Sequence, residues 1–177
     1  MRGYFGVGIF HAKNECNIGT LMRSAYCFGA NFVFTVGRRY RRQSSDTVNT
    51  GGNIPQYTYE DMDHLRENLP VGCRIIGVEL AQGAYPVGDY AHPDQCVYML
   101  GAEDHGITPS ALAKCHQVIQ IPDLSHCLNV SVAGSIVLFD RQQYFKRRFT
   151  VQGAKTCRTQ SKIPNLAALR TPSLNAR

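Results

Sequence analysis

Residues 119–140 read IQIPDLSHCLNVSVAGSIVLFD, and they predict a strand, a short polar loop and a helix. Apolar residues run up to Pro122, and both Asn129 and Ser131 stand at the start of a helix predicted over 129–148. One such residue is enough to cap a helix, so two in the first turn suggest another role for the pair. Because the following turns are apolar, the pair predicts a polar site held against a hydrophobic core.

The other apolar stretches alternate with amphipathic ones along the chain. Residues 37–53 lack an apolar period and predict a loop. We expect Asn17 to cap the first helix and Thr58 to begin the second, with Asp61 as its capping partner, while Thr108 begins the third. We predict strands over 4–10, 31–36, 73–80, 96–101 and 116–122, and helices over 17–30, 58–69 and 108–115. This order indicates an α/β fold around a mostly parallel sheet, with ligands at the carboxyl ends of the strands.

Charge is unevenly distributed along the 177 residues. Residues 1–140 hold 10 Lys and Arg against 13 Asp and Glu, whereas residues 141–177 hold 9 Lys and Arg and no acidic residue. A basic end favours a polyanionic partner, and nucleic acid rather than membrane, because no segment is long and apolar enough to span a bilayer. A basic tail that only aids solubility is the alternative. We expect a domain over 1–149 and a flexible tail over 150–177.

The seven cysteines favour a reducing, cytoplasmic setting, because their count is odd and no signal-peptide pattern opens the chain. Two pairs of neighbours, Cys115–His116 and His126–Cys127, would be needed to supply four zinc ligands. Neighbouring residues on a strand point to opposite faces, and the chain has no C-x-x-C pair. We therefore expect no metal site.

Several widespread catalytic signatures are missing from the sequence. No G-x-G-x-x-G follows a predicted strand and no G-x-x-x-x-G-K-[ST] occurs, which argues against a Rossmann dinucleotide site and a P-loop. A Rossmann-type methyltransferase acting on a small molecule or a protein loses support for the same reason. No G-x-S-x-G elbow occurs, so a hydrolase is not favoured.

Three other stretches match a known pattern in their order and spacing. They are NIGTLMR with Asn17, Gly19 and Arg23, then LGAEDHGI with Gly101, Glu103 and Gly106, and IPDLSHCLNVSVAGSIVL with Ile121, Pro122, Leu128, Asn129 and Ser131. Together they resemble the three signature motifs of the SpoU (TrmH-like) branch of the SPOUT RNA methyltransferases. The resemblance covers roughly residues 4–145.

The resemblance implies a SPOUT-type α/β knot, with a deep trefoil knot in the carboxyl half that local periodicity cannot reveal. It implies a homodimer, and S-adenosyl-L-methionine held by the knot loops through Leu80, Gly101, Ile121 and Leu128. It further implies methyl transfer to a ribose 2′-hydroxyl of RNA, with tRNA expected first and rRNA otherwise.

The same resemblance implies catalytic roles for Asn17, Arg23, Glu103, Asn129 and Ser131. A guanidinium is always protonated and therefore a poor general base. We interpret Arg23 as a clamp on the adjacent phosphate that also stabilises developing alkoxide charge, in a site shared with the partner subunit. Asn17 is expected to position Arg23, and Glu103 to orient Arg23 or Asn129. Asn129 and Ser131 are expected to face the reacting groups.

RNA contact is expected from two clusters in which arginines alternate with aromatic residues. The first is GRRYRR, with Arg38, Arg39, Arg41 and Arg42, and the second is RQQYFKRR, with Arg141, Lys146, Arg147 and Arg148. Such clusters suit phosphate contacts combined with base stacking. The second also fits the solvated end of a helix, where cations favour the helix dipole.

One residue departs from the family pattern, because Cys127 stands where relatives usually carry Ser before Leu-Asn-Val-Ser. A thiol is a weaker hydrogen-bond partner than a hydroxyl. This change keeps an alternative function open, that of a non-catalytic RNA-binding or assembly protein that retains the methyltransferase fold.

Overall fold

The computed structural model describes residues 3–37, 52–102, 104–122 and 126–154. Strands and helices alternate along these residues. The strands are β1 (Tyr4–Phe10), β2 (Phe32–Val36), β3 (Gln56–Tyr59), β4 (Arg74–Val78), β5 (Tyr85–Pro86), β6 (Gln95–Leu100) and β7 (Gln117–Gln120). The helices are α1 (Glu15–Phe28), α2 (Met62–Glu67), α3 (Pro109–Leu112), α4 (Val130–Ala154) and the short 3-10 helix η2 (Val87–Asp89).

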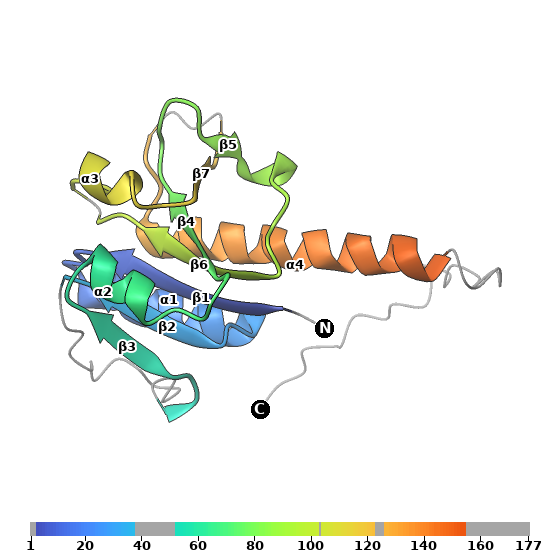
Figure 1. Ribbon diagram of the computed structural model, residues 1–177, viewed down its shortest axis with the longest axis horizontal. Helices are drawn as coiled ribbons and strands as arrows, with labels where there is room; N and C mark the ends of the chain where they lie inside the picture. Colours follow the sequence, from blue (N-terminus) through green and yellow to red (C-terminus); the bar gives the residue numbers. More distant parts are fainter. Residues whose placement is uncertain (1–2, 38–51, 103, 123–125, 155–177) are drawn as a thin grey trace, which may run out of the picture.

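The strands form one sheet in the order β3-β2-β1-β6-β4-β7-β5 (Figure 1). Every strand pair in the described part of the chain is parallel. β6 lies between β1 and β4, where Tyr98 pairs with Val7 on one side and with Ile76 on the other. The predicted α/β fold is confirmed, and apolar strands suit it because a parallel sheet is covered on both faces.

Helices cover the two faces of the sheet in separate pairs. Phe5 and Val7 of β1 belong to the core cluster that contains Leu21 of α1 and Leu138 of α4. On the opposite face, a second cluster joins the sheet to α2 and α3, and Leu65 is its fully buried member from α2. The long helix α4 runs along the sheet and extends beyond it (Figure 1). The two helix layers are thus held by alternate side chains of the same strands.

Close contact between α1 and α4 depends on a small residue. A Cβ atom on Gly134 would lie 2.4 Å from Cδ1 of Leu21, which is itself buried. Beside this contact, the Ser135 hydroxyl donates to the Ser24 hydroxyl at 2.8 Å. The first and third motifs are brought together because α1 and α4 carry them side by side.

Some predicted element boundaries are wrong. Asn14, and not Asn17, caps α1, because its side chain accepts from the Cys16 amide at 2.9 Å. Thr58 lies within β3, and the following helix begins after Asp61, whose carboxylate accepts from two amides of its first turn at 2.9 Å. Thr108 caps α3 as predicted. The sequence also missed β3 and β5, which are four and two residues long.

The guanidinium of Arg141 is buried near the amino ends of β1 and β6, with 2% of the residue exposed. Its Nη1 donates to the carbonyl of Pro93 at 2.6 Å and to the Tyr98 hydroxyl at 3.3 Å, and its Nη2 donates to the carbonyl of Asp94 at 3.2 Å. The Phe5 ring stacks on the same group, with its centroid 4.5 Å from Cζ. The prediction that Arg141 binds RNA is therefore wrong, because a phosphate cannot reach this side chain.

Four further expectations concern the whole chain. The trefoil knot stays a prediction. α4 continues to Ala154, past the domain boundary expected at 149, and residues 155–177 lie outside the described part. None of the described helices is both long and apolar enough to cross a membrane. Within the described ranges, no three His, Cys, Asp or Glu side chains are placed to hold a metal ion.

Candidate active site

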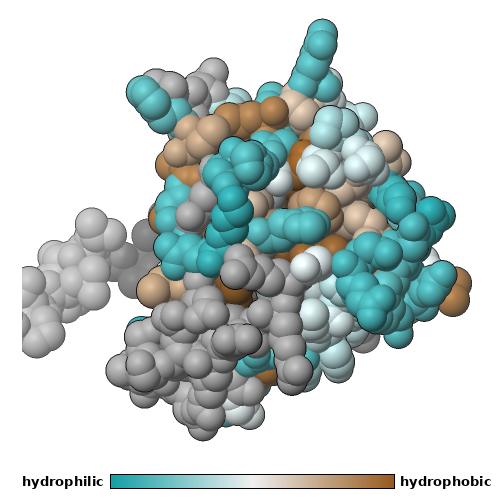
Figure 2. Space-filling model, turned by 90° about the vertical axis from the view of Figure 1, so that its left-hand side faces the viewer, coloured by the Kyte–Doolittle hydropathy of each residue, from teal (hydrophilic) through white to brown (hydrophobic). Residues whose placement is uncertain are grey.

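The carboxyl ends of β4, β6 and β7 border one cavity of about 310 Å³. Figure 2 views the molecule from this end of the sheet, where apolar and hydrophilic surface lie side by side. The four residues expected to contact the cofactor, Leu80, Gly101, Ile121 and Leu128, all line the cavity. Their contact with the cofactor stays a prediction. The lining comprises Val78, Glu79, Leu80, Leu100, Gly101, Ala102, Asp104, His105, Gly106, Gln120, Ile121, Cys127, Leu128, Val130 and Ala133.

The loop of the second motif packs tightly against the end of β4. Gly106 has a φ of +61°, and a Cβ atom there would lie 2.4 Å from Oε2 of Glu79. The same Oε2 accepts from the amide of Ile107 at 2.8 Å, and Oε1 accepts from the amide of Leu80 at 3.0 Å. A side chain at 106 would be both strained and obstructed, so this position requires glycine. Glu103 of the same motif lies outside the described residues.

Three side chains of the first and third motifs form one hydrogen-bond network beside the cavity. Asn129 Nδ2 donates to Asn17 Oδ1 at 3.0 Å, which links α4 to α1. Asn129 Oδ1 accepts from the Ser131 amide at 2.9 Å and from the Ser131 hydroxyl at 2.6 Å. Asn129 therefore caps α4 and belongs to the polar network at once. Asn17 and Ser131 are buried, so their orientation is fixed by this network.

The structure does not bring Arg23 to this network within a single chain. Arg23 is exposed on α1, six residues after Asn17. At 3.6 residues per turn, these two side chains point about 120° apart and lie about 9 Å apart along the helix axis. Asn17 bonds to Asn129 instead, so the expectation that Asn17 positions Arg23 is not met in one chain.

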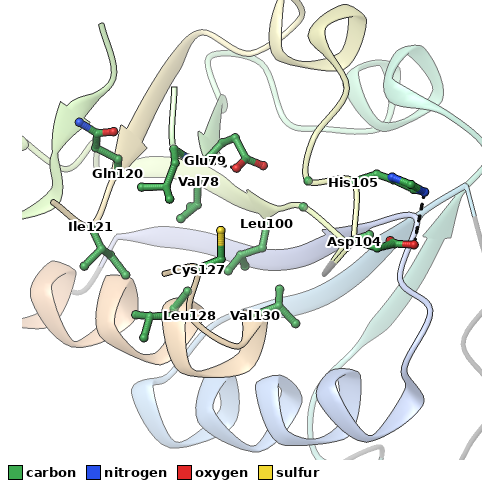
Figure 3. Close-up of a pocket in the computed structure, with 15 residues that line it drawn as sticks. Val78, Glu79, Leu100, Asp104, His105, Gln120, Ile121, Cys127, Leu128 and Val130 are labelled. Atoms are coloured by element: carbon green, nitrogen blue, oxygen red, sulfur yellow. Dashed lines mark hydrogen bonds and ion pairs between the residues drawn. The ribbon is translucent and has the colours of Figure 1, made fainter. Parts of the chain in front are cut away.

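The rim of the cavity carries charges that the sequence did not single out. Lys13, in the loop before α1, forms an ion pair with Asp104 of the second-motif loop. His105 Nε2 also lies 3.3 Å from the Asp104 carboxylate, as Figure 3 shows. The signal that could have found Glu79 is its position, an acidic residue directly after an apolar strand at the ligand-binding end of a parallel sheet.

Of the two basic clusters, the structure describes only the second. Arg38, Arg39, Arg41 and Arg42 lie outside the described residues. Lys146, Arg147 and Arg148 are exposed on α4. Arg147 lies 3.9 Å from the Asp140 carboxylate and Arg148 lies 3.4 Å from that of Asp94. Surface pairs of this kind are weak, so these cations can exchange their partners for phosphate.

Comparison with known proteins finds a family model and several relatives that match this chain. A model of the SpoU rRNA Methylase family matches residues 5–139. The tRNA (guanosine(18)-2'-O)-methyltransferase of Escherichia coli (strain K12) is 31% identical over 134 residues, which are 72% of this chain and 58% of that protein. The 23S rRNA (guanosine-2'-O-)-methyltransferase RlmB of Acinetobacter baylyi is 32% identical over 79 residues, 44% of this chain and 31% of that protein. The chain thus spans 58% of the length of the Escherichia coli relative.

Solved structures share the fold at lower sequence identity. The TrmH/SpoU tRNA modifying enzyme of A. aeolicus superposes with a TM-score of 0.73 at 19% identity, over 84% of this chain and 78% of that one. An AdoMet-bound rRNA methyltransferase from Sinorhizobium meliloti gives 0.68 at 22% identity, over 81% of this chain and 57% of that one. The family model matches residues 5–139, which include both edge strands of the sheet and all three motifs. The chain therefore belongs to the SpoU rRNA Methylase family.

Proposed function

We propose that this protein transfers a methyl group from S-adenosyl-L-methionine to a ribose 2′-hydroxyl of RNA, of tRNA first and of rRNA otherwise. The observation that carries the proposal is the hydrogen bond between Asn17 and Asn129, which joins the first and third motifs beside the cavity. The curated relatives named above, which act on guanosine riboses of tRNA and 23S rRNA, support the same reaction.

The cavity fits the proposed cofactor in size and lining. A volume of about 310 Å³ lies within the usual range for small-molecule sites. Leu100, Ile121 and Leu128 supply apolar walls for an adenine ring, and Gly101 and Gly106 leave backbone groups accessible. When bound, S-adenosyl-L-methionine supplies an electrophilic methyl group. The residues of this chain bind and orient the groups around it.

The amides of Asn17 and Asn129 suit the orientation of a ribose hydroxyl, because both are fixed and neither titrates. Arg23 binds the phosphate next to that hydroxyl and stabilises the negative charge that develops on its oxygen. Glu103 is proposed to orient Arg23 or Asn129. Catalysis on this view is positional and electrostatic.

A homodimer follows from the position of Arg23, which points away from the amide network of its own chain. In a dimer, Arg23 of one subunit reaches the site of the other. Val132 and Phe139 support this proposal, since they are 48% and 53% exposed on α4 and lie seven residues apart on one helix face.

RNA is proposed to contact the cluster from Arg38 to Arg42, together with Lys146, Arg147 and Arg148.

The test is transfer of a labelled methyl group from S-adenosyl-L-methionine to unmodified total tRNA and, separately, to rRNA, followed by nucleoside analysis. We expect the label in a 2′-O-methyl nucleoside. Arg23→Ala should abolish transfer and leave cofactor affinity within about threefold, because Arg23 is proposed to bind phosphate. Arg66→Ala, an exposed arginine on α2, is the control and should transfer normally. An active Arg23→Ala variant would remove Arg23 from the mechanism.

A second candidate function rests on Cys127, which lines the cavity where a thiol replaces the usual hydroxyl. In this case the protein binds RNA and retains the fold without transferring methyl groups. Cofactor binding without any labelled nucleoside would favour it, and restored transfer in Cys127→Ser would identify the thiol as the cause.

A further inference from the structure

Glu79 is a carboxylate at the cavity to which the proposed mechanism gives no part. It follows β4 directly, and its two oxygens accept from the amides of Leu80 and Ile107 at 3.0 and 2.8 Å. Figure 3 shows Val78 and Glu79 extending from the end of β4, above Leu100. These two hydrogen bonds fix the carboxylate plane, and the bare backbone of Gly106 makes room for it.

Both oxygens of Glu79 retain capacity for another hydrogen bond. A carboxylate has about four acceptor positions, and the two amides occupy one on each oxygen. None of the described Lys, Arg or His side chains forms an ion pair with it. The other carboxylate that lines the described cavity is that of Asp104, and it already faces Lys13 and His105. Among the described lining residues, Glu79 therefore supplies the carboxylate that is available to accept hydrogen bonds from a ligand.

We propose that Glu79 binds the two hydroxyls of the adenosine ribose of the cofactor, one on each oxygen. This inference rests on the proposed function, which places an adenosine moiety in this cavity. A vicinal diol presents two donors at the spacing of the two carboxylate oxygens, and the fixed carboxylate needs no reorientation to receive them. The apolar walls select for the adenine ring, and Glu79 selects for an intact ribose.

The test compares two ligands, S-adenosylhomocysteine and its 2′,3′-dideoxy analogue, by calorimetry on the full chain. The wild-type protein should bind the ribose form about 10- to 100-fold more tightly, as expected for hydrogen bonds to a charged acceptor. In Glu79→Gln this ratio should fall to within about threefold. Asp104→Asn is the matched control, because it changes the other carboxylate of the cavity and should keep the wild-type ratio.

The ratio of the affinities for the two ligands distinguishes recognition of the ribose by Glu79 from a role of Glu79 in holding the backbone at Leu80 and Ile107. If Glu79 only holds Leu80 and Ile107, Glu79→Gln weakens both ligands by the same factor, and that result overturns the proposal even if binding of both is lost. Equal affinity of the wild-type protein for the two ligands overturns it as well. If the wild-type protein binds neither ligand, the proposed function fails and the assignment of Glu79 fails with it.

Discussion

The side-chain amide of Asn129 has its two ends bound to different helices. Its oxygen accepts two hydrogen bonds from Ser131 in α4, and its nitrogen donates to Asn17 in α1. Because both ends are occupied by defined partners, the amide cannot flip without losing hydrogen bonds on both sides. One residue therefore sets the start of α4 and the geometry of the site.

We expect Asn129→Ala to lower methyl transfer by about 100-fold or more, since small displacements of positioning groups have effects of that size. Loss of the helix cap should also lower the free energy of unfolding by about 1 kcal/mol. Transfer assays and urea denaturation measure the two effects. Asn68→Ala is the control, because it removes a hydrogen bond at the end of α2, to the His64 carbonyl, far from the motifs in sequence. Equal loss of transfer in both variants would contradict the role of Asn129.

The placement of Asn129 and Ser131 in one polar network could be predicted from the sequence because its signal is local. Asn129 and Ser131 crowd one helix start, which the sequence shows directly. Arg141 was misjudged because its hydrogen-bond acceptors, Pro93 and Asp94, come from a loop 48 and 47 residues away. Within RQQYFKRR nothing distinguishes a buried arginine from exposed ones.

Arg141→Ala should lower the free energy of unfolding by about 3 kcal/mol or more, because it removes three hydrogen bonds, one of them to the buried Tyr98 hydroxyl, and opens a cavity between aromatic rings. Arg148→Ala, which removes an exposed ion pair with Asp94, should change it by less than about 1 kcal/mol. Urea denaturation of both variants decides the comparison. Similar stabilities would contradict the interior role of Arg141.

At the scale of elements, a chain of hydrogen bonds joins β6 to α4. Arg141 donates to the Tyr98 hydroxyl, which donates to Nδ1 of His92 at 2.5 Å, and Nε2 of His92 donates to the Asp140 carboxylate at 2.9 Å. Neutral His92 with its proton on Nε2 satisfies this direction. Burial lowers the pKa of His92, and the Asp140 carboxylate opposes that shift without reversing it.

This chain makes stability depend on pH. The unfolded protein binds a proton at His92 near the ordinary pKa of about 6.5, whereas the folded protein, with its lowered pKa, does not. The stabilisation is present above pH 6.5 and is lost as the pH falls, with a slope of at most about 1.4 kcal/mol per pH unit. His92→Gln should reduce this slope in urea denaturation between pH 7 and 5. An unchanged slope in His92→Gln would contradict the assignment.

Elements were predicted well where the apolar run was long. β1, β2, β4 and β6 are five to seven residues long and mostly buried, and each was predicted within two residues of its bounds. β3 and β5 were missed because they are short and partly exposed, and they exist because β2 and β7 offer them backbone partners. Asn17 was taken for a cap because Asn14 and Asn17 are the same residue type, and packing against α4 decides between them.

At the scale of the whole molecule, the proposed dimer gives a prediction. Val132→Asp combined with Phe139→Asp should yield a monomer that does not transfer methyl groups, because Arg23 then lacks a partner site. Val71→Asp, at a fully exposed position far from α4 in sequence, is the control and should remain dimeric. Analytical ultracentrifugation and transfer assays measure both outcomes. A fully active wild-type monomer would overturn the shared site.

The position of β6 in the sheet affects when β1 can pair during synthesis on the ribosome. β1 is made first, yet its inner neighbour begins at Gln95, so β1 waits for synthesis of residues 11–94. At about 5–20 residues per second this takes roughly 4–17 s. Throughout that time the apolar segment YFGVGIF has an open edge, a template for pairing with other nascent chains. Slower translation of residues 11–94 should therefore increase aggregation. β1 can gain its second neighbour only after β6 has been synthesised.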